Sequence, residues 1–186
     1  LIKKNLGESN WYLRDSNWDP DFITSSDQAR WFINKELSRN TDGTIAFNLL
    51  FLKDCLEVVG PIQLQDFNET ITSSNFLEKS VYYSETDSSY GLGQKDFFNQ
   101  VANNIFEKIK RMDEKAWMQL LNILDKNLTE KNFLITLNDN KASALFAKNG
   151  WNGAIRQPST KNTIEQNTDY LMLVDANLGI NKANYF

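Results

Sequence analysis

The sequence predicts one α/β domain in which helices flank a mixed β-sheet. Three patterns predict this class: strand–helix–strand over residues 44–64, an amphipathic helix over residues 97–112, and apolar strands at residues 133–137 and 170–174. Alternating helices and strands are typical of a layered α/β fold. With 186 residues, the chain is long enough for one such domain with a substantial core.

The first predicted helix covers residues 26–38. Ser25 and Gln28 have the spacing of a capping box, in which both side chains satisfy free backbone N–H groups. The apolar positions that follow recur at helical spacing: Ala29, Phe32, Ile33 and Leu37. This spacing predicts a helix with one apolar face.

The region that follows predicts a βαβ unit. A turn at residues 41–43 precedes a short strand at residues 44–47 and an apolar helix at residues 49–59. Gly60 and Pro61 end that helix, because Gly permits a left-handed cap and Pro cannot continue a helix. A second strand is expected at residues 62–64.

The middle of the chain is predicted to be helical. One helix is expected at residues 72–83, and residues 84–93 form a polar loop. The amphipathic helix at residues 97–112 follows, with apolar residues three and four apart. A further helix begins after Asp113, and its inner face carries Trp117, Leu120, Leu121 and Leu124.

The last elements are two strands and a helix. Residues 133–137 alternate as a strand, and the helix after them ends at Asn149-Gly150, where Trp151 is placed to close a Schellman-type contact. Residues 170–174 are continuously apolar, which is typical of a strand covered on both faces.

Composition excludes several functions. The net charge is −4, and the Arg residues are scattered: Arg14, Arg30, Arg39, Arg111 and Arg156. Nucleic-acid binding requires a basic face, so no nucleic-acid partner is expected. The chain has no His and one Cys, Cys55, which rules out imidazole chemistry and an intrachain disulfide framework. Cys55 is expected to be a buried, inert thiol within a helix.

The sequence predicts no membrane span in this chain. No apolar run approaches the roughly 18–20 residues that a spanning helix needs, and the first residues are no signal peptide. The chain starts at Leu1 without Met, so we expect it to be the later part of a longer protein.

Residues 14–22 are the first candidate site. Asp15, Asn17, Asp19 and Asp21 alternate, a spacing that lets oxygen ligands converge on Ca²⁺ or Mg²⁺, and Trp18 and Phe22 are expected to anchor the loop. The match to an EF-hand fails, because the sixth position is Pro20 and the twelfth is Ser26. The alternative is that these side chains cap turns and brace the helix start without a metal.

Arg14 is the second candidate. Its planar donor fork suits a phosphate or a carboxylate. The alternative is an internal ion pair with Asp15 that holds the loop.

Three blocks of the chain resemble the bacterial family catalogued as domain of unknown function 4012. These blocks are residues 11–22, residues 42–62 and residues 169–184. The resemblance implies an extracytoplasmic domain of a cell-envelope protein, anchored in the membrane by an upstream segment that this chain lacks, together with an upstream strand region. In the third block, Asn177, Gly179, Asn181 and Asn184 also fit a tight turn after a buried strand.

A more distant similarity is to the LytR-CpsA-Psr phosphotransferases, which move lipid-linked polymers onto the bacterial wall. Leu13-Arg14-Asp15-Ser16 resembles their Pro-Arg-Asp segment, and residues 97–112 resemble their long helix near the prenyl pocket. The resemblance implies a LytR-CpsA-Psr-like fold and a pyrophosphate site at Arg14 and Lys95. Two departures stand out: Leu13 replaces the Pro, and only Gln94-Lys95 stands where a second Arg cluster is expected.

These observations leave three functions open. The first is a non-catalytic domain that binds or organises cell-wall or surface polymer. The second is a phosphotransferase acting on lipid-pyrophosphate-linked glycopolymer, with Arg14 and Lys95 on pyrophosphate and Asp15 or Asp19 on Mg²⁺. The third is a structural domain stabilised by a cation at Asp15, Asp19 and Asp21. Whether the protein is an enzyme stays open.

Overall fold

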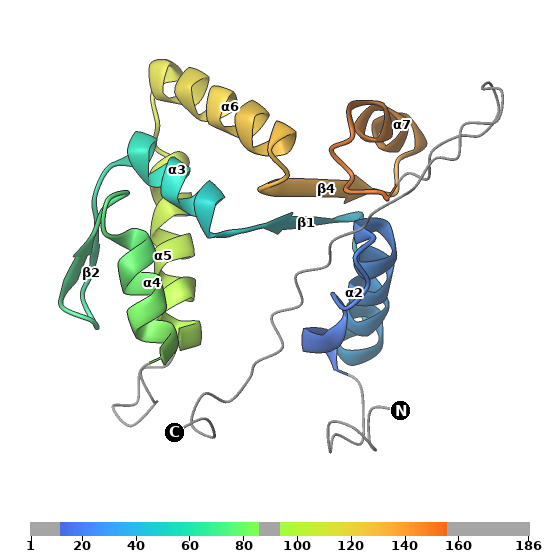
Figure 1. The fold of residues 1–186 in the computed structure, drawn as a ribbon, viewed down its shortest axis with the longest axis horizontal. Coiled ribbons are helices and arrows are strands. Elements are labelled where there is room, and N and C mark those ends of the chain that lie inside the picture. Colours follow the sequence, from blue (N-terminus) through green and yellow to red (C-terminus); the bar gives the residue numbers. More distant parts are fainter. Residues whose placement is uncertain (1–11, 86–93, 156–186) are drawn as a thin grey trace, which may run out of the picture. The chain divides into compact units, whose positions relative to one another are not determined.

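The computed structural model describes residues 12–85 and 94–155, which contain both helices and strands (Figure 1). In chain order the elements are η1 (Leu13–Asp15), α2 (Phe22–Leu37), β1 (Gly43–Phe47), α3 (Leu49–Val59), β2 (Ile62–Leu64), β3 (Glu69–Ile71), α4 (Phe76–Glu85), α5 (Gln94–Ile109), α6 (Glu114–Thr129), β4 (Phe133–Leu137) and α7 (Asn140–Asn149). The predicted α/β class is confirmed.

The chain divides into two compact units. Residues 1–39 and 154–186 form the first unit, and residues 40–153 form the second. Each unit is described by itself below. The expectation of a single domain stays a prediction.

In the first unit, α2 begins earlier than the sequence pattern indicated. Asp21 is its N-cap, and the Asp21 side chain accepts a 3.0 Å hydrogen bond from the Thr24 backbone N–H. The Ser25 hydroxyl instead donates to the Asp19 carbonyl at 2.7 Å. The predicted capping box at Ser25 and Gln28 is therefore wrong, because an equally good cap residue stands four positions upstream. Phe32 is buried, as its helical spacing predicted.

In the second unit, the strand–helix–strand pattern at residues 44–64 forms as β1, α3 and β2, but the two strands do not share a sheet. β1 pairs antiparallel with β4, with Ile45 opposite Ile135, and β2 pairs antiparallel with β3. Among the described residues the sheets are thus two antiparallel pairs instead of one mixed sheet. Partner choice depends on contacts distant in sequence, which local patterns do not encode.

The β2–β3 hairpin contains a strand that the sequence pattern did not reveal. β3 covers three residues, and Asn68 at the turn has a φ of 50°, a left-handed conformation that Asn tolerates. After the hairpin, α4 starts at Phe76 instead of the predicted residue 72. The Thr72 N–H is taken by the Asn75 side chain at 2.8 Å, which holds residues 72–75 in a turn.

The core of the second unit lies between α3, the β2–β3 hairpin and helices α4 to α6. Its fully buried members include Leu56, Ile62, Phe76, Phe97 and Ile105. In α6 only part of the predicted inner face is buried: Leu120 is, whereas Trp117 and Leu121 are about half exposed at 43% and 50%. Cys55 is fully buried in α3, which confirms its predicted burial, while its inertness stays a prediction.

Helix α7 ends as predicted. Gly150 adopts φ 71° and its N–H donates to the Ala147 carbonyl, while the Trp151 N–H donates to the Phe146 carbonyl at 2.9 Å. The rings of Phe146 and Trp151 lie 6.2 Å apart. These are the two hydrogen bonds and the apolar contact of a Schellman motif.

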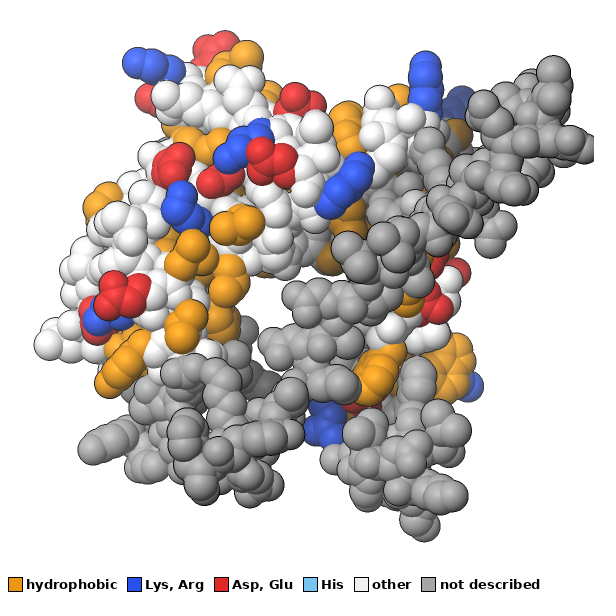
Figure 2. Space-filling model, in the orientation of Figure 1, with side chains coloured by type: hydrophobic (Ala, Val, Ile, Leu, Met, Phe, Trp, Pro, Cys, Tyr) orange, Lys and Arg blue, Asp and Glu red, His pale blue; other side chains and the backbone are white. Residues whose placement is uncertain are grey.

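The viewed surface carries no basic cluster among the described side chains. Lys and Arg are scattered between acidic side chains, and hydrophobic side chains gather over α3 to α5 (Figure 2). Within residues 12–85 and 94–155, no helix combines the length and apolarity needed to cross a membrane. The predicted strand at residues 170–174 lies outside the described residues.

Candidate functional site

Arg14 lies in a short 3-10 turn of the first unit. The turn is closed by two hydrogen bonds between Tyr12 and Asp15: the Asp15 N–H donates to the Tyr12 carbonyl at 2.8 Å, and the Tyr12 N–H donates to the Asp15 carboxylate at 3.0 Å. The Arg14 guanidinium lies over the Tyr12 ring, 5.1 Å from its centroid. This geometry is that of a cation–π contact.

The ion pair expected between Arg14 and Asp15 is present but loose. Arg14 Nε lies 3.8 Å from the Asp15 carboxylate, and the Arg14 side chain is 64% exposed. An exposed pair at this separation contributes little stability. The Arg14 side chain is therefore largely exposed, with its guanidinium over the Tyr12 ring.

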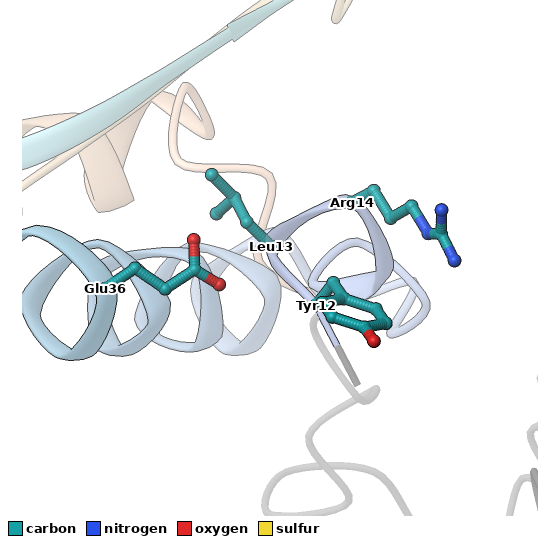
Figure 3. A pocket seen from close by; sticks show the side chains of 4 residues that line it. All are labelled: Tyr12, Leu13, Arg14 and Glu36. Carbon is teal, nitrogen blue, oxygen red and sulfur yellow. The ribbon is translucent and has the colours of Figure 1, made fainter. Parts of the chain in front are cut away.

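Arg14 lines an open pocket of about 340 Å³ together with Tyr12, Leu13 and Glu36. Figure 3 shows the Glu36 carboxylate reaching from α2 towards Leu13, while the Arg14 guanidinium points away from α2. The pocket thus offers an aromatic ring, a donor fork and a carboxylate. It combines a cation and an anion in one lining, so it suits a polar ligand with both donors and acceptors.

The three candidate metal ligands each hold backbone groups. The Asp19 carboxylate accepts from the Asp21 N–H at 2.8 Å, and Asp15 accepts from Tyr12 as described. One Asp21 oxygen caps α2 through Thr24, and the other accepts from the Ile155 N–H at 2.9 Å. The hydrogen bond from Thr24 is the main cause that lowers the pKa of Asp21, outweighing the opposing effect of burial.

These contacts match the alternative that the acids cap turns and brace the start of α2. Within residues 12–85 and 94–155, no group of three or more carboxylate or thiol side chains is placed to hold a metal ion. The expectation of Ca²⁺ or Mg²⁺ at Asp15, Asp19 and Asp21 stays a prediction.

The two aromatic side chains predicted to anchor the loop, Trp18 and Phe22, differ in burial. Phe22 is partly buried at the first position of α2, whereas Trp18 is 56% exposed. The prediction that Trp18 anchors the loop is wrong, because Asp21 and Ser25 hold the loop through hydrogen bonds instead. Trp18 is left as an exposed aromatic side chain.

Two further predictions cannot be placed in this site. Lys95 is the second residue of α5 in the second unit, and its side chain lies outside the described part of the chain. Residues 169–184 also lie outside it. The expected pairing of Arg14 with Lys95 on a pyrophosphate stays a prediction.

Sequence reasoning missed Tyr12, Glu36 and Trp31. Trp31 is 56% exposed, with the Lys35 ammonium 5.9 Å from its ring centroid. A signal for Trp31 was available, because it falls off the apolar stripe of its helix. No sequence signal places Glu36 and Tyr12 in the lining of one pocket, since that depends on how η1 packs against α2.

A comparison of the chain with protein-family models supports part of the resemblance to domain of unknown function 4012. The model of the family described as "Protein of unknown function (DUF4012)" matches residues 3–82. This match includes the blocks at residues 11–22 and 42–62, so the resemblance to that family is confirmed over this segment. Comparisons with curated proteins and with solved structures gave no significant match.

Proposed function

We propose that this chain is an extracytoplasmic cell-envelope domain that binds or organises cell-wall or surface polymer without catalysing a reaction. The observation that carries the proposal is the open pocket lined by Arg14, which lies over the Tyr12 ring, and by Glu36. The family match at residues 3–82 supports the envelope context only through the resemblance described above.

The side chains of the first unit suit a sugar polymer. Aromatic rings that stay exposed offer flat apolar surfaces on which the C–H faces of sugar rings pack, and Tyr12, Trp18 and Trp31 are 43%, 56% and 56% exposed. The Glu36 carboxylate accepts hydrogen bonds from hydroxyl groups, and Arg14 binds phosphate or carboxylate groups of an anionic polymer.

The shape of the pocket favours a polymer over a small molecule. Small-molecule sites usually enclose most of the ligand surface. Here four residues of one short turn and one helix line an open surface, so a long chain can pass across it. Affinity is then expected to come from several weak contacts along the polymer.

The test measures retention of the purified chain by bacterial cell walls, with and without their attached anionic polymer. We expect the wild-type chain to bind, and the Tyr12→Leu plus Arg14→Gln variant to bind about tenfold more weakly, a loss of roughly 1.4 kcal/mol. Arg111→Gln is the matched control, because Arg111 is 80% exposed in the other unit. A folded wild-type chain that no wall preparation retains, or a double variant that binds normally, would contradict the proposal.

The phosphotransferase alternative has one observation in its favour, the exposed Arg14 at a pocket. Against it, the lining holds a single cationic side chain, Arg14, and also the Glu36 carboxylate, whereas a pyrophosphate carries several negative charges. It predicts Mg²⁺-dependent cleavage of a lipid-pyrophosphate-linked oligosaccharide, abolished by Arg14→Gln. If the chain binds cell walls but does not cleave this substrate, the binding proposal is the better explanation.

A further inference from the structure

The chain contains two Asn-x-Ser/Thr sequons, the pattern that accepts an N-linked glycan on the Asn side chain. One is Asn68-Glu69-Thr70 and the other is Asn127-Leu128-Thr129. In both, an acidic residue stands two positions before the Asn, at Asp66 and at Asp125. The sequence therefore gives no reason to prefer one sequon, because a glycan requires a surface position and exposure is a property of the fold.

Asn68 lies at the end of the turn that joins β2 to β3. Its side chain is exposed and its φ is 50°, and Figure 1 shows this hairpin at the margin of the second unit. The left-handed backbone explains why an Asn is tolerated here. It does not use the side-chain amide, which makes no hydrogen bond within the described residues.

Phe67 fixes which side of the turn faces solvent. The Phe67 ring lies 4.9 Å from the Tyr83 ring and 5.6 Å from the Phe97 ring. Phe97 is fully buried, so Phe67 anchors the turn to the core of the second unit. Asn68 follows this anchor directly and remains at the surface, where a glycan would extend into solvent.

The residues on either side of Asn68 in the sequon pattern are exposed as well. The Thr70 hydroxyl donates to the Gln63 side chain at 2.6 Å, and its oxygen keeps the capacity to accept a hydrogen bond. Asp66 accepts from the Gln100 amide at 2.6 Å, and bacterial oligosaccharyltransferases recognise an acidic residue at this place. Acid, amide and hydroxyl thus stand together on one short exposed hairpin.

Asn127 is in the opposite environment. It lies within α6 and its side chain is 0% exposed. The two N–H groups of its amide are both used, because Nδ2 donates to the Asp54 carboxylate and to the Ile123 carbonyl, each at 2.9 Å. This amide becomes accessible only when α6 separates from α3, so the folded chain offers Asn68 alone.

We propose that Asn68 is the acceptor of an N-linked glycan whose donor is a lipid-pyrophosphate-linked oligosaccharide. In the transfer, the Asn68 side-chain nitrogen forms a bond to the anomeric carbon of the first sugar, and the bond from that carbon to the pyrophosphate oxygen breaks. The lipid pyrophosphate leaves with the bonding electron pair, and the nitrogen gives one proton to a base of the transferase. Modification in cells rests on the proposed extracytoplasmic location, whereas the capacity of Asn68 to accept the glycan does not.

The test offers the folded full chain to a purified bacterial oligosaccharyltransferase with its lipid-linked oligosaccharide. The intact mass should rise by one oligosaccharide, and peptide mapping should assign it to Asn68. Asn68→Gln and Thr70→Val should stay unmodified, whereas Thr70→Ser keeps the hydroxyl and should be glycosylated. Circular dichroism should be unchanged in all three variants, because both side chains are exposed.

The second sequon is the matched control. Synthetic peptides of residues 64–72 and 123–131 have no tertiary structure to bury either Asn, so both should be glycosylated. In the folded chain Asn127 should stay unmodified. The proposal is overturned if the peptide of residues 64–72 is not an acceptor while a reference peptide is, if the folded chain is not modified, or if Thr70→Val is modified as well as the wild type. Modification of Asn127 in the folded chain also overturns it.

Measurements in cells separate this inference from the proposed function. Fractionation gives the location of the chain, and mass spectrometry of the peptide that contains Asn68 gives its modification. A chain found in the cytoplasm contradicts the proposed location. A chain found outside the cytoplasm with Asn68 unmodified contradicts the inference drawn from the hairpin.

Discussion

Asp54 in α3 and Lys126 in α6 form an ion pair of 2.9 Å that joins two helices of the second unit. The Asp54 side chain is 9% exposed and the Lys126 side chain is 54% exposed, so the pair reaches from the helix interface to solvent. Asp54 also accepts a 2.9 Å hydrogen bond from the fully buried Asn127 amide, which in turn donates to the Ile123 carbonyl. A buried carboxylate with two donors locks the orientation of α6 against α3.

Replacing Asp54 should destabilise the second unit. We expect Asp54→Ala to lower the free energy of unfolding by about 2 to 3 kcal/mol, because the buried Asn127 amide loses one of its acceptors and a charge-assisted hydrogen bond is lost. Urea denaturation followed by circular dichroism measures this change. Asp125→Ala, at an exposed position of the facing helix α6, is the control and should stay within about 0.5 kcal/mol of the wild type. If Asp54→Ala changed the free energy of unfolding as little as Asp125→Ala does, the Asp54–Lys126 pair would not stabilise the second unit.

Lowering the pH should reduce the free energy of unfolding of the second unit, because the Asp54 carboxylate becomes protonated. Burial raises the pKa of Asp54, but the hydrogen bonds from Lys126 and Asn127 and the nearby positive charges outweigh it, so the pKa lies below its ordinary value of 3.8. The folded state therefore binds a proton less readily than the unfolded state. The stability from Asp54 is fully present above that ordinary value and is lost as pH falls through the folded-state pKa.

The measurement is the free energy of unfolding from about pH 7 down to about pH 2. The wild type should lose stability more steeply at low pH than Asp54→Asn, which cannot titrate at this position. Identical slopes for the two proteins would contradict the assigned shift.

Asp21 should control the start of α2. Asp21→Ala removes the acceptor for the Thr24 and Ile155 N–H groups, and loss of a helix N-cap costs about 0.5 to 2 kcal/mol. Hydrogen exchange should speed up at both amides. Asp21→Asn keeps an oxygen for Thr24 and should protect that amide better than Ala does. Asp27→Ala, within the same helix, should leave both amides protected.

The Cys55 thiol should be inert in the folded chain. Burial, with a contribution from the neighbouring Asp54 charge, raises the pKa of Cys55 to about 12, so almost no thiolate exists near neutral pH. We expect alkylation at about pH 8 to be at least about 100-fold slower in the native chain than in denaturant. An engineered exposed thiol at Leu145 gives the reference rate. Rapid native labelling of Cys55 would show that α3 opens readily.

Local patterns predicted most elements but not how strands pair. Residues 44–47, 49–59 and 62–64 formed the expected strand, helix and strand, since periodicity and the Gly60 cap act over a few residues. The pairing of β1 with β4 joins segments about ninety positions apart along the chain, and no local signal distinguishes that partner from β2. Asp21 and Ser25 both have side chains suited to an N-cap, and α2 uses Asp21, so the helix begins at Phe22.

The candidate site shows the same division. The sequence by itself determined the α/β class, the absence of His, the burial of Cys55 and the Gly150–Trp151 helix end, because each follows from residue type and short-range spacing. Only the tertiary structure decided that Glu36 lines the same pocket as Tyr12 and Arg14, that Trp18 is exposed, and that Asp19 and Asp21 hold backbone groups. Those outcomes depend on which surfaces are buried against each other, and burial is a property of the whole packed unit and not of any single segment.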